Sequence, residues 1–168
     1  LTCTALSCSG QALASTSQGT EPENENVIVT GTREIHKKVR DSLSPVDVVS
    51  NREMLNTGQT NATAALAQIL PSVTRPAVGQ FDGAPTDFIS LRGLNPNQTL
   101  VLVNGKRHHN SSYLYTDGFA DGATPTDIDL IAPELIDHIE VLRDGAAAQY
   151  GSDAIAGVVN IILKKADH

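Results

Sequence analysis

This chain of 168 residues lacks a long apolar run, tryptophan and an excess of basic residues. A helix that crosses a bilayer needs about 20 consecutive apolar residues. No such run occurs, so the sequence predicts no transmembrane helix. The formal net charge is −7, which argues against a general nucleic-acid binder because such proteins present a basic face. The length is sufficient for one domain with its own core.

Cysteine is almost absent. Cys3 and Cys8 are the two cysteines, their spacing matches no metal site, and a disulfide between them would join only the N-terminal tail. Residues 1–14 are small, mildly apolar and uncharged, and residues 12–14 (ALA) fit an A-x-A cleavage site. We interpret residues 1–14 as the remnant of a secretory signal peptide. A native N-terminal tail is the alternative.

Catalytic motifs are also missing. The chain contains no G-x-S-x-G, H-E-x-x-H, P-loop or G-x-G-x-x-G pattern, and no pair of carboxylates predicts general acid–base work. His108 and His109 are adjacent, and adjacent side chains on an extended backbone point to opposite faces. Asp117 and Asp121 lack the spacing of a calcium loop. We therefore expect no enzyme, no metal site and no cofactor. A hydrolase that uses this loop would lose activity in His109→Ala.

Two strand-like runs near the C-terminus are the most informative feature present. Ile139–Leu142 and Val158–Leu163 are apolar except for Glu140 and Asn160, and the segment between them is rich in glycine and alanine. Positions with little or no side chain let backbone approach other groups closely. No nucleophile and base are paired in this stretch, so it predicts packing rather than catalysis.

The remaining patterns predict an α+β domain at residues 46–168, with a small mixed sheet, two or three short helices and long loops. Residues 50–53 (SNRE) form a capping box that opens a short helix. An apolar stripe over residues 62–70 predicts a second helix, which Pro71 ends. The other expectations are strands at 46–49, 88–92 and 99–103, a type I′ hairpin turn at Asn104-Gly105, and long loops at 75–87 and 108–127.

Residues 15–45 are predicted to form a flexible N-terminal arm that contains one β-prone run, Val27–Thr30. With no obvious partner within the chain, this run could add to the sheet edge of another protein, or form an edge strand of its own domain. Arg92 and Arg143 each end an apolar strand before a flexible turn. Arginine pairs with carboxylates in a planar, bidentate geometry, so the two either bind a shared acidic partner or cap their strands with solvated charge.

Three segments together resemble the plug domain of TonB-dependent outer-membrane receptors over about residues 27–165. They are VIVTGTR at 27–33, FISLRGLNPNQTLVLVNGKR at 88–107 and DLIAPELIDHIEVLRDGAAAQYGSDAIAGVVNIILKK at 129–165. Each segment alone is a weak signal, but their order and spacing are specific. One departure is Asp144-Gly145, which replaces the Gly-Pro that follows the arginine in the family pattern.

The resemblance implies a plug-domain fold that fills the lumen of a large β-barrel in the outer membrane, with a periplasmic N-terminus. It implies energy-coupled uptake of a large scarce nutrient, such as a siderophore, vitamin or saccharide. The expected partners are the TonB C-terminal domain, the receptor's own barrel, which this chain lacks, and a small-molecule ligand such as a metal chelate or saccharide. Nucleic acid is not expected as a partner.

The resemblance also assigns roles to residues. Val27, Ile28, Val29 and Thr30 would be the TonB box or the strand just following it, and the barrel contacts would be Arg92 and Arg143. The ligand contacts would come from the long loops, at Phe81, His109, Tyr113 and Tyr115. Because a barrel needs about ten residues per strand, we expect an excised plug, a truncated product or a free-standing plug. The alternative function is a free-standing secreted or periplasmic binding domain.

Overall fold

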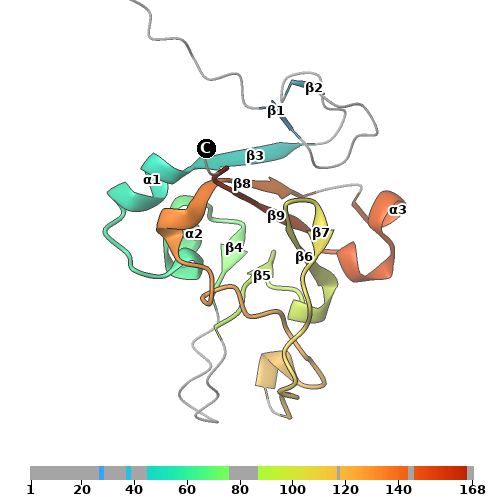
Figure 1. The fold of residues 1–168 in the computed structure, drawn as a ribbon. Coiled ribbons are helices and arrows are strands. Elements are labelled where there is room, and N and C mark those ends of the chain that lie inside the picture. Colours follow the sequence, from blue (N-terminus) through green and yellow to red (C-terminus); the bar gives the residue numbers. More distant parts are fainter. Residues whose placement is uncertain are drawn as a thin grey trace, which may run out of the picture.

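A five-stranded mixed sheet forms the centre of the domain (Figure 1). The computed structural model describes residues 45–75, 87–116, 118–143 and 146–165, and the backbone of residues 27–28 and 37–38. The strand order is β3-β8-β9-β6-β7, in which β6 and β9 are parallel and the other neighbours are antiparallel. The strands are β3 (Val46–Ser50), β6 (Thr99–Val103), β7 (Lys106–Arg107), β8 (Ile136–Leu142) and β9 (Gly157–Leu163).

The apolar runs near the C-terminus are β8 and β9, as the sequence predicted. They lie next to each other in the interior of the sheet, and side chains on successive residues point to opposite faces. Ile139 and Val141 belong to the larger core, whereas Leu142 and Val158 belong to a second apolar cluster on the other side. Strands that are covered on both faces have near-continuous apolar sequences, which explains these two runs.

Helices α1 (Asn51–Asn56) and α2 (Ala62–Ile69) supply the larger core with Met54, Ala65 and Leu66. The predicted capping box is present, because the Ser50 hydroxyl accepts from Glu53 N at 3.3 Å and the Glu53 carboxylate accepts from Ser50 N at 2.8 Å.

A distant residue caps the second helix. The N-cap residue of α2, Asn61, makes no capping bond with its side chain. The Asp129 carboxylate instead accepts from Thr63 N at 3.2 Å and from the Thr63 hydroxyl at 2.8 Å. This cap joins residues far apart in sequence, so local patterns do not predict it.

The segment expected as a strand at 88–92 is shorter than predicted. Only β5 (Ser90–Leu91) is a strand, and it pairs with β4 (Val73–Thr74) in a separate two-stranded sheet. Arg92 ends it early because its backbone is left-handed, with φ of 57°. The type I′ turn is confirmed, since Asn104 and Gly105 have φ of 49° and 75°.

The glycine- and alanine-rich connection between β8 and β9 contains helical turns that the sequence analysis did not predict. They are α3 (Ala146–Tyr150) and a 3-10 turn at Ser152–Ala154. Tyr150 and Ala154 pack on the second apolar cluster. Other 3-10 turns lie at Pro96–Gln98, Gly118–Ala120 and Pro133–Leu135.

Close backbone approach occurs at one glycine of this region. A Cβ atom on Gly157 would lie 2.5 Å from the Leu142 carbonyl oxygen and 2.7 Å from Leu91 Cδ1. At Gly151 no atom of another described residue, apart from its chain neighbours, lies within 4 Å of a Cβ position. The prediction of close packing is therefore correct for Gly157 and wrong for Gly151. Among the described residues, no helix is long and apolar enough to cross a membrane.

Candidate functional site

The N-terminal β-prone run has a partner inside the chain. β1 (Val27–Ile28) pairs antiparallel with β2 (Lys37–Lys38), in a two-stranded sheet separate from the main sheet (Figure 1). The expectation that this run has no obvious partner within the chain was wrong, because Val27–Ile28 pairs with Lys37–Lys38. Val29 and Thr30, the other half of the expected TonB box, lie outside the described residues.

Arg92 sits in a tight turn directly after β5. Arg92 and Gly93 both have positive φ, 57° and 69°, and Leu94 N donates to the Leu91 carbonyl at 3.0 Å. Two left-handed central residues are typical of a type I′ turn. Arg92 N donates to the Ser72 carbonyl at 2.9 Å, which fixes the backbone, and the residue is exposed.

Arg143 follows β8 and forms an ion pair with a residue of the neighbouring strand. Its Nη2 donates to Asp47 Oδ1 at 2.7 Å, and both side chains are partly buried. Its Nε is buried and has no hydrogen-bond acceptor among the described residues. The role of Asp47 as the partner of Arg143 was not predicted from the sequence, because only the antiparallel β3–β8 pairing brings the two residues close together. Asp144 lies outside the described residues.

Gly157 brings the two arginine-bearing strand ends together. The position of a Cβ atom on Gly157 is 2.7 Å from Leu91, the residue before Arg92, and 3.5 Å from Arg143 Cα. The strands that carry the arginines are far apart in sequence and belong to different sheets. The Leu91 side chain and the Arg143 backbone therefore share one packing point at Gly157.

The long 108–127 loop lies at the end of the domain opposite β3 and has a small aromatic core (Figure 1). Tyr115 is 1% exposed and packs edge-to-face against Phe88, with ring centroids 5.2 Å apart, and against Tyr113 at 4.9 Å. Tyr115 N donates to the Ala123 carbonyl, and Gly122 N donates back to the Tyr115 carbonyl. The loop is therefore folded on itself rather than irregular.

The residues expected to contact the ligand differ in their exposure to solvent. Tyr115 is buried and cannot meet a ligand in this conformation, so its assignment as a ligand contact does not fit the structure. His109 is exposed and Tyr113 is half-buried, whereas Phe81 lies outside the described residues. Leu114 and Phe119 are 54% and 46% exposed in the same loop. Leu114 and Phe119 were not predicted as ligand contacts from the sequence. Their large apolar side chains within a loop could have indicated them.

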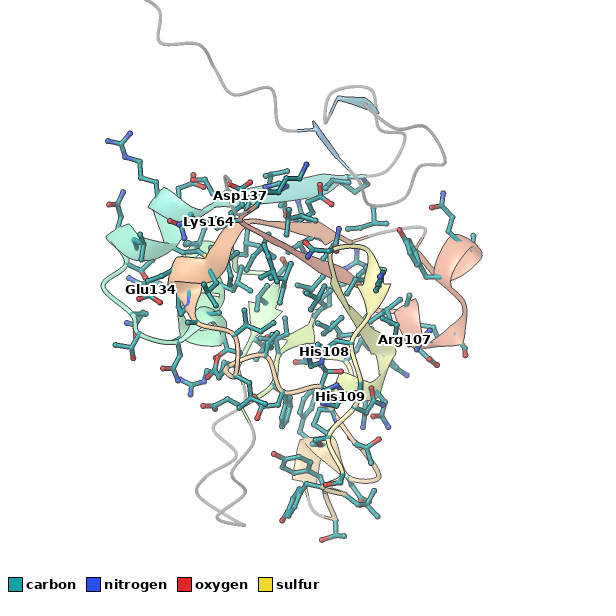
Figure 2. The ribbon with its side chains drawn as sticks, in the orientation of Figure 1. Arg107, His108, His109, Glu134, Asp137 and Lys164 are labelled. Carbon is teal, nitrogen blue, oxygen red and sulfur yellow. The ribbon has the colours of Figure 1, made fainter. Side chains whose placement is uncertain are left out.

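His108 and His109 are stacked, with ring centroids 4.4 Å apart. They lie far from Asp137 and Lys164, which are at the opposite end of the domain (Figure 2). The two stacked rings therefore do not point to opposite faces as predicted, because the chain after β7 is not a regular strand. Among the described residues, no group of three or more His, Cys, Asp or Glu side chains could hold a metal ion.

A half-open pocket of about 230 Å³ lies beside this loop. Its lining is mainly polar and includes Asn97, Thr99, Arg107, Asn110, Thr126 and Asp153. Arg107 and Asp153 form an ion pair at the pocket, and each side chain is 52% exposed. Asn97 joins the Pro96–Gln98 turn to the loop, since its Oδ1 accepts from Thr124 N and its Nδ2 donates to the Gly122 carbonyl.

Two groups of charged residues have shifted pKa values. The Arg75 guanidinium, 2.7 Å from Asp87, lowers the pKa of that carboxyl group, whereas burial raises the pKa of Asp129. On β8, the Glu140 carboxylate, 3.6 Å from His138 Nε2, is the main cause that raises the pKa of His138, and Asp137 adds to it against the opposing effect of burial. Glu140 itself is fully buried.

Comparisons with known proteins agree with this geometry. A family model described as TonB-dependent Receptor Plug Domain matches residues 38–158. The chain is 43% identical over 77 residues to the ferrienterobactin receptor of Escherichia coli K12, covering 46% of this chain and 10% of that receptor. It is 30% identical over 145 residues to the vitamin B12 transporter BtuB of Vibrio vulnificus, covering 86% of this chain and 21% of the transporter.

Solved structures show the same relation. The crystal structure of the siderophore receptor PirA from Acinetobacter baumannii matches with a TM-score of 0.60 and 32% identity, covering 77% of this chain and 18% of that one. The chain therefore corresponds to a small part of these receptors and transporters. The family match and the mixed sheet with short helices lead to one conclusion: the chain belongs to the TonB-dependent receptor plug domain family.

Proposed function

We propose that this domain gates an outer-membrane receptor that imports a large scarce nutrient, with a ferric siderophore as the first candidate. The ferrienterobactin receptor and the siderophore receptor PirA support the siderophore, and the B12 transporter supports a vitamin as the alternative substrate. The observation that carries the gating role is the convergence of the Arg92 and Arg143 strand ends on Gly157.

Arg143 is suited to exchange partners. Its Nη2 is bound to Asp47, whereas its buried Nε has no acceptor among the described residues. The Arg143–Asp47 pair is partly exposed, so a barrel carboxylate could displace Asp47 and bind the guanidinium in its place. Arg92, exposed on a fixed turn, is the second contact.

The handle for TonB is the run Val27–Thr30. Strand addition uses backbone hydrogen bonds for affinity, and Val27–Ile28 already forms such bonds with Lys37–Lys38. A strand of TonB can replace this two-residue pairing at small cost, because the pairing is so short. The ligand would contact the 108–127 loop through His109 and Tyr113, together with the exposed Leu114 and Phe119.

The gating role is tested in the full-length receptor by charge reversal at Arg92. We expect Arg92→Glu to loosen the association between plug and barrel, measured as a lower force needed to extract the plug. Arg52→Glu is the matched control, because Arg52 is also exposed but lies on α1, away from the Gly157 contact. An equal extraction force in wild type, Arg92→Glu and Arg52→Glu would refute the role of Arg92.

The TonB handle has its own test. A peptide that covers residues 24–33 should bind the TonB C-terminal domain in a titration, and a peptide with proline at Ile28 should not, because proline removes a backbone donor. Equal binding by both peptides, or none by either, would remove the assignment. Sequencing the gene beyond Lys165 separates the receptor from the free-standing domain, since only a receptor continues into barrel strands.

The substrate class is tested by uptake. Cells that express the full-length receptor should accumulate an iron-loaded catecholate siderophore but not cyanocobalamin, and accumulation should fall in His109→Ala and Tyr113→Ala. Accumulation of cyanocobalamin alone would favour the vitamin. Unchanged uptake in both variants would show that the 108–127 loop does not contact the substrate through these residues.

A further inference from the structure

Asn104 occupies the exposed turn between β6 and β7 and is followed by glycine. We propose that Asn104 is a latent deamidation site, which the fold protects while the β6–β7 hairpin is bound to β9 and which becomes reactive when the hairpin separates from β9. The proposal concerns covalent modification of the chain by water. It does not depend on the proposed transport role.

The reaction needs only the chain and water. Gly105 N loses its proton to solvent and attacks Asn104 Cγ. A new C–N bond closes a five-membered succinimide, and the bond from Cγ to the side-chain nitrogen breaks, so that ammonia leaves with protons from solvent. Water then opens either carbonyl and leaves aspartate or isoaspartate. Glycine favours the attack because no side chain crowds the nitrogen.

In the structure, the attacking nitrogen is already in use. Gly105 N donates to Asn160 Oδ1 at 3.0 Å. An amide oxygen is a hydrogen-bond acceptor and not an effective base, so it keeps the proton on Gly105 N. The attacked group is held as well, because Asn104 Oδ1 accepts from Leu163 N at 2.9 Å. Asn104 N donates to the Ile161 carbonyl at 2.9 Å, which completes three bonds between the turn and β9.

Asn160 is fixed in the orientation that this protection needs. It is fully buried, and its Nδ2 donates to Glu140 Oε2 at 3.1 Å. With its nitrogen directed at the carboxylate, its oxygen faces Gly105. A buried polar side chain needs hydrogen-bond partners, and the turn supplies one of them. The two polar residues that interrupt the apolar strands, Glu140 and Asn160, therefore act together to hold the Asn104-Gly105 turn.

The products would not restore this arrangement. Either product replaces the amide of Asn104 with a carboxylate close to the Asn160–Glu140 pair, and isoaspartate also lengthens the backbone of the turn by one carbon. A two-residue type I′ turn tolerates little change in length. A chain that is modified while the hairpin is separated from β9 would therefore re-form the hairpin–β9 contacts poorly. The fraction of modified chains would then increase with the number of opening events.

The first test compares the full chain in native buffer and in concentrated urea, both mildly alkaline and warm. Trypsin releases residues 93–106, in which mass spectrometry with fragmentation locates the mass gain and chromatography separates isoaspartate. We expect modification at Asn104 to be about a hundredfold slower in native buffer, equivalent to an opening free energy of about 2.7 kcal/mol. Equal rates in the two buffers, or no reaction in urea, would overturn the proposal.

The second test isolates Asn160. Asn160→Ala removes the acceptor of Gly105 N, whereas Val158→Ala weakens the same strand in the other apolar cluster without contact to the turn. At matched stability, set with urea, Asn160→Ala should modify Asn104 at least about tenfold faster than Val158→Ala. Equal rates would show that Asn160 gives no specific protection. If Asn160→Ala does not fold, the comparison of native buffer with urea in the unaltered chain still decides whether the fold protects Asn104.

Discussion

Arg92 and Arg143 follow two strand ends that have similar sequences. In each, an apolar run is followed by an arginine and then by a flexible turn. Both ends pack against Gly157, yet the structure holds the two arginines differently. Arg143 is partly buried and forms an ion pair with Asp47 at 2.7 Å. Arg92 is exposed, its backbone is left-handed, and its N–H donates to the Ser72 carbonyl.

The difference shows two ways to fix a charged side chain. At Arg143 a side-chain ion pair fixes the position, and this contact can be exchanged for another carboxylate. At Arg92 the backbone itself is held in place, because a left-handed conformation of a residue with a Cβ costs about 1–2 kcal/mol and persists only where its surroundings impose it. Strain of this kind is retained at functional sites more often than elsewhere, which favours a functional side chain at Arg92.

The largest expected effect comes from breaking the point that the two ends share. Gly157→Ala places a Cβ atom 2.5 Å from the Leu142 carbonyl oxygen at a φ of 144°, and we expect it to destabilise the chain by about 3 kcal/mol or more. Gly151→Ala is the control, because its φ is also positive, 92°, but nothing lies within 4 Å. Urea unfolding followed by circular dichroism measures both. Equal losses of stability would contradict the packing argument.

Arg92→Gly sharpens the comparison by removing the backbone strain. Glycine adopts positive φ without a Cβ penalty, so we expect the variant to be more stable by about 0.5–1 kcal/mol after its larger unfolded-state entropy is included. Arg92→Ala removes the same side chain and keeps the strain, so it should be less stable than Arg92→Gly. If the two variants unfold at the same urea concentration, the left-handed backbone is not strained.

A double-mutant cycle with Asp47→Asn and Arg143→Met measures the ion pair. We expect a coupling of about 0.5–1 kcal/mol, because both side chains are partly exposed, and a smaller value in high salt. The pair Arg107 and Asp153 is the control, because its side chains are more exposed, 52% each, and it should couple more weakly. The reverse order would show that burial does not set the strength of these pairs.

The smallest effect concerns the other end of β8. The nearby Glu140 carboxylate raises the pKa of His138 above its usual value of 6.5, so the folded state binds this proton more tightly than the unfolded state. The resulting stability is present in full below pH 6.5 and is lost as the pH rises through the higher pKa of the folded state. His138→Gln should flatten the stability profile above pH 6.5. An unchanged profile would assign this pH dependence to other groups.

The sequence predicted most of the elements because their signals are local. The capping box at Ser50, the apolar stripe of α2, the Asn104-Gly105 turn and the apolar runs of β8 and β9 each depend on residues close in the chain. The helical turns between β8 and β9 were missed, because small residues carry little periodicity. The pairing of β1 with β2 was not predicted, because Val27–Thr30 was interpreted without reference to the residues that follow it in the chain.

The candidate site was predictable only in part, for the same reason. Arg92 and Arg143 stood out by their places at strand ends, and the family resemblance gave them a role. Their convergence on Gly157 could not be read from the sequence, since it joins two different sheets. Tyr115 was predicted as a ligand contact from its residue type, but in the structure its side chain is buried against Phe88.

The sequence by itself determined the family, the α+β class and the turn chemistry, because ordered motifs, apolar periodicity and residues suited to positive φ are all encoded locally. The tertiary structure alone decided which groups meet. Asp47 reaches Arg143, Asn160 reaches Gly105, and Asp129 caps a helix from 66 residues away. These contacts depend on strand register and on packing between distant segments, where a shift of one residue would turn each side chain to the other face.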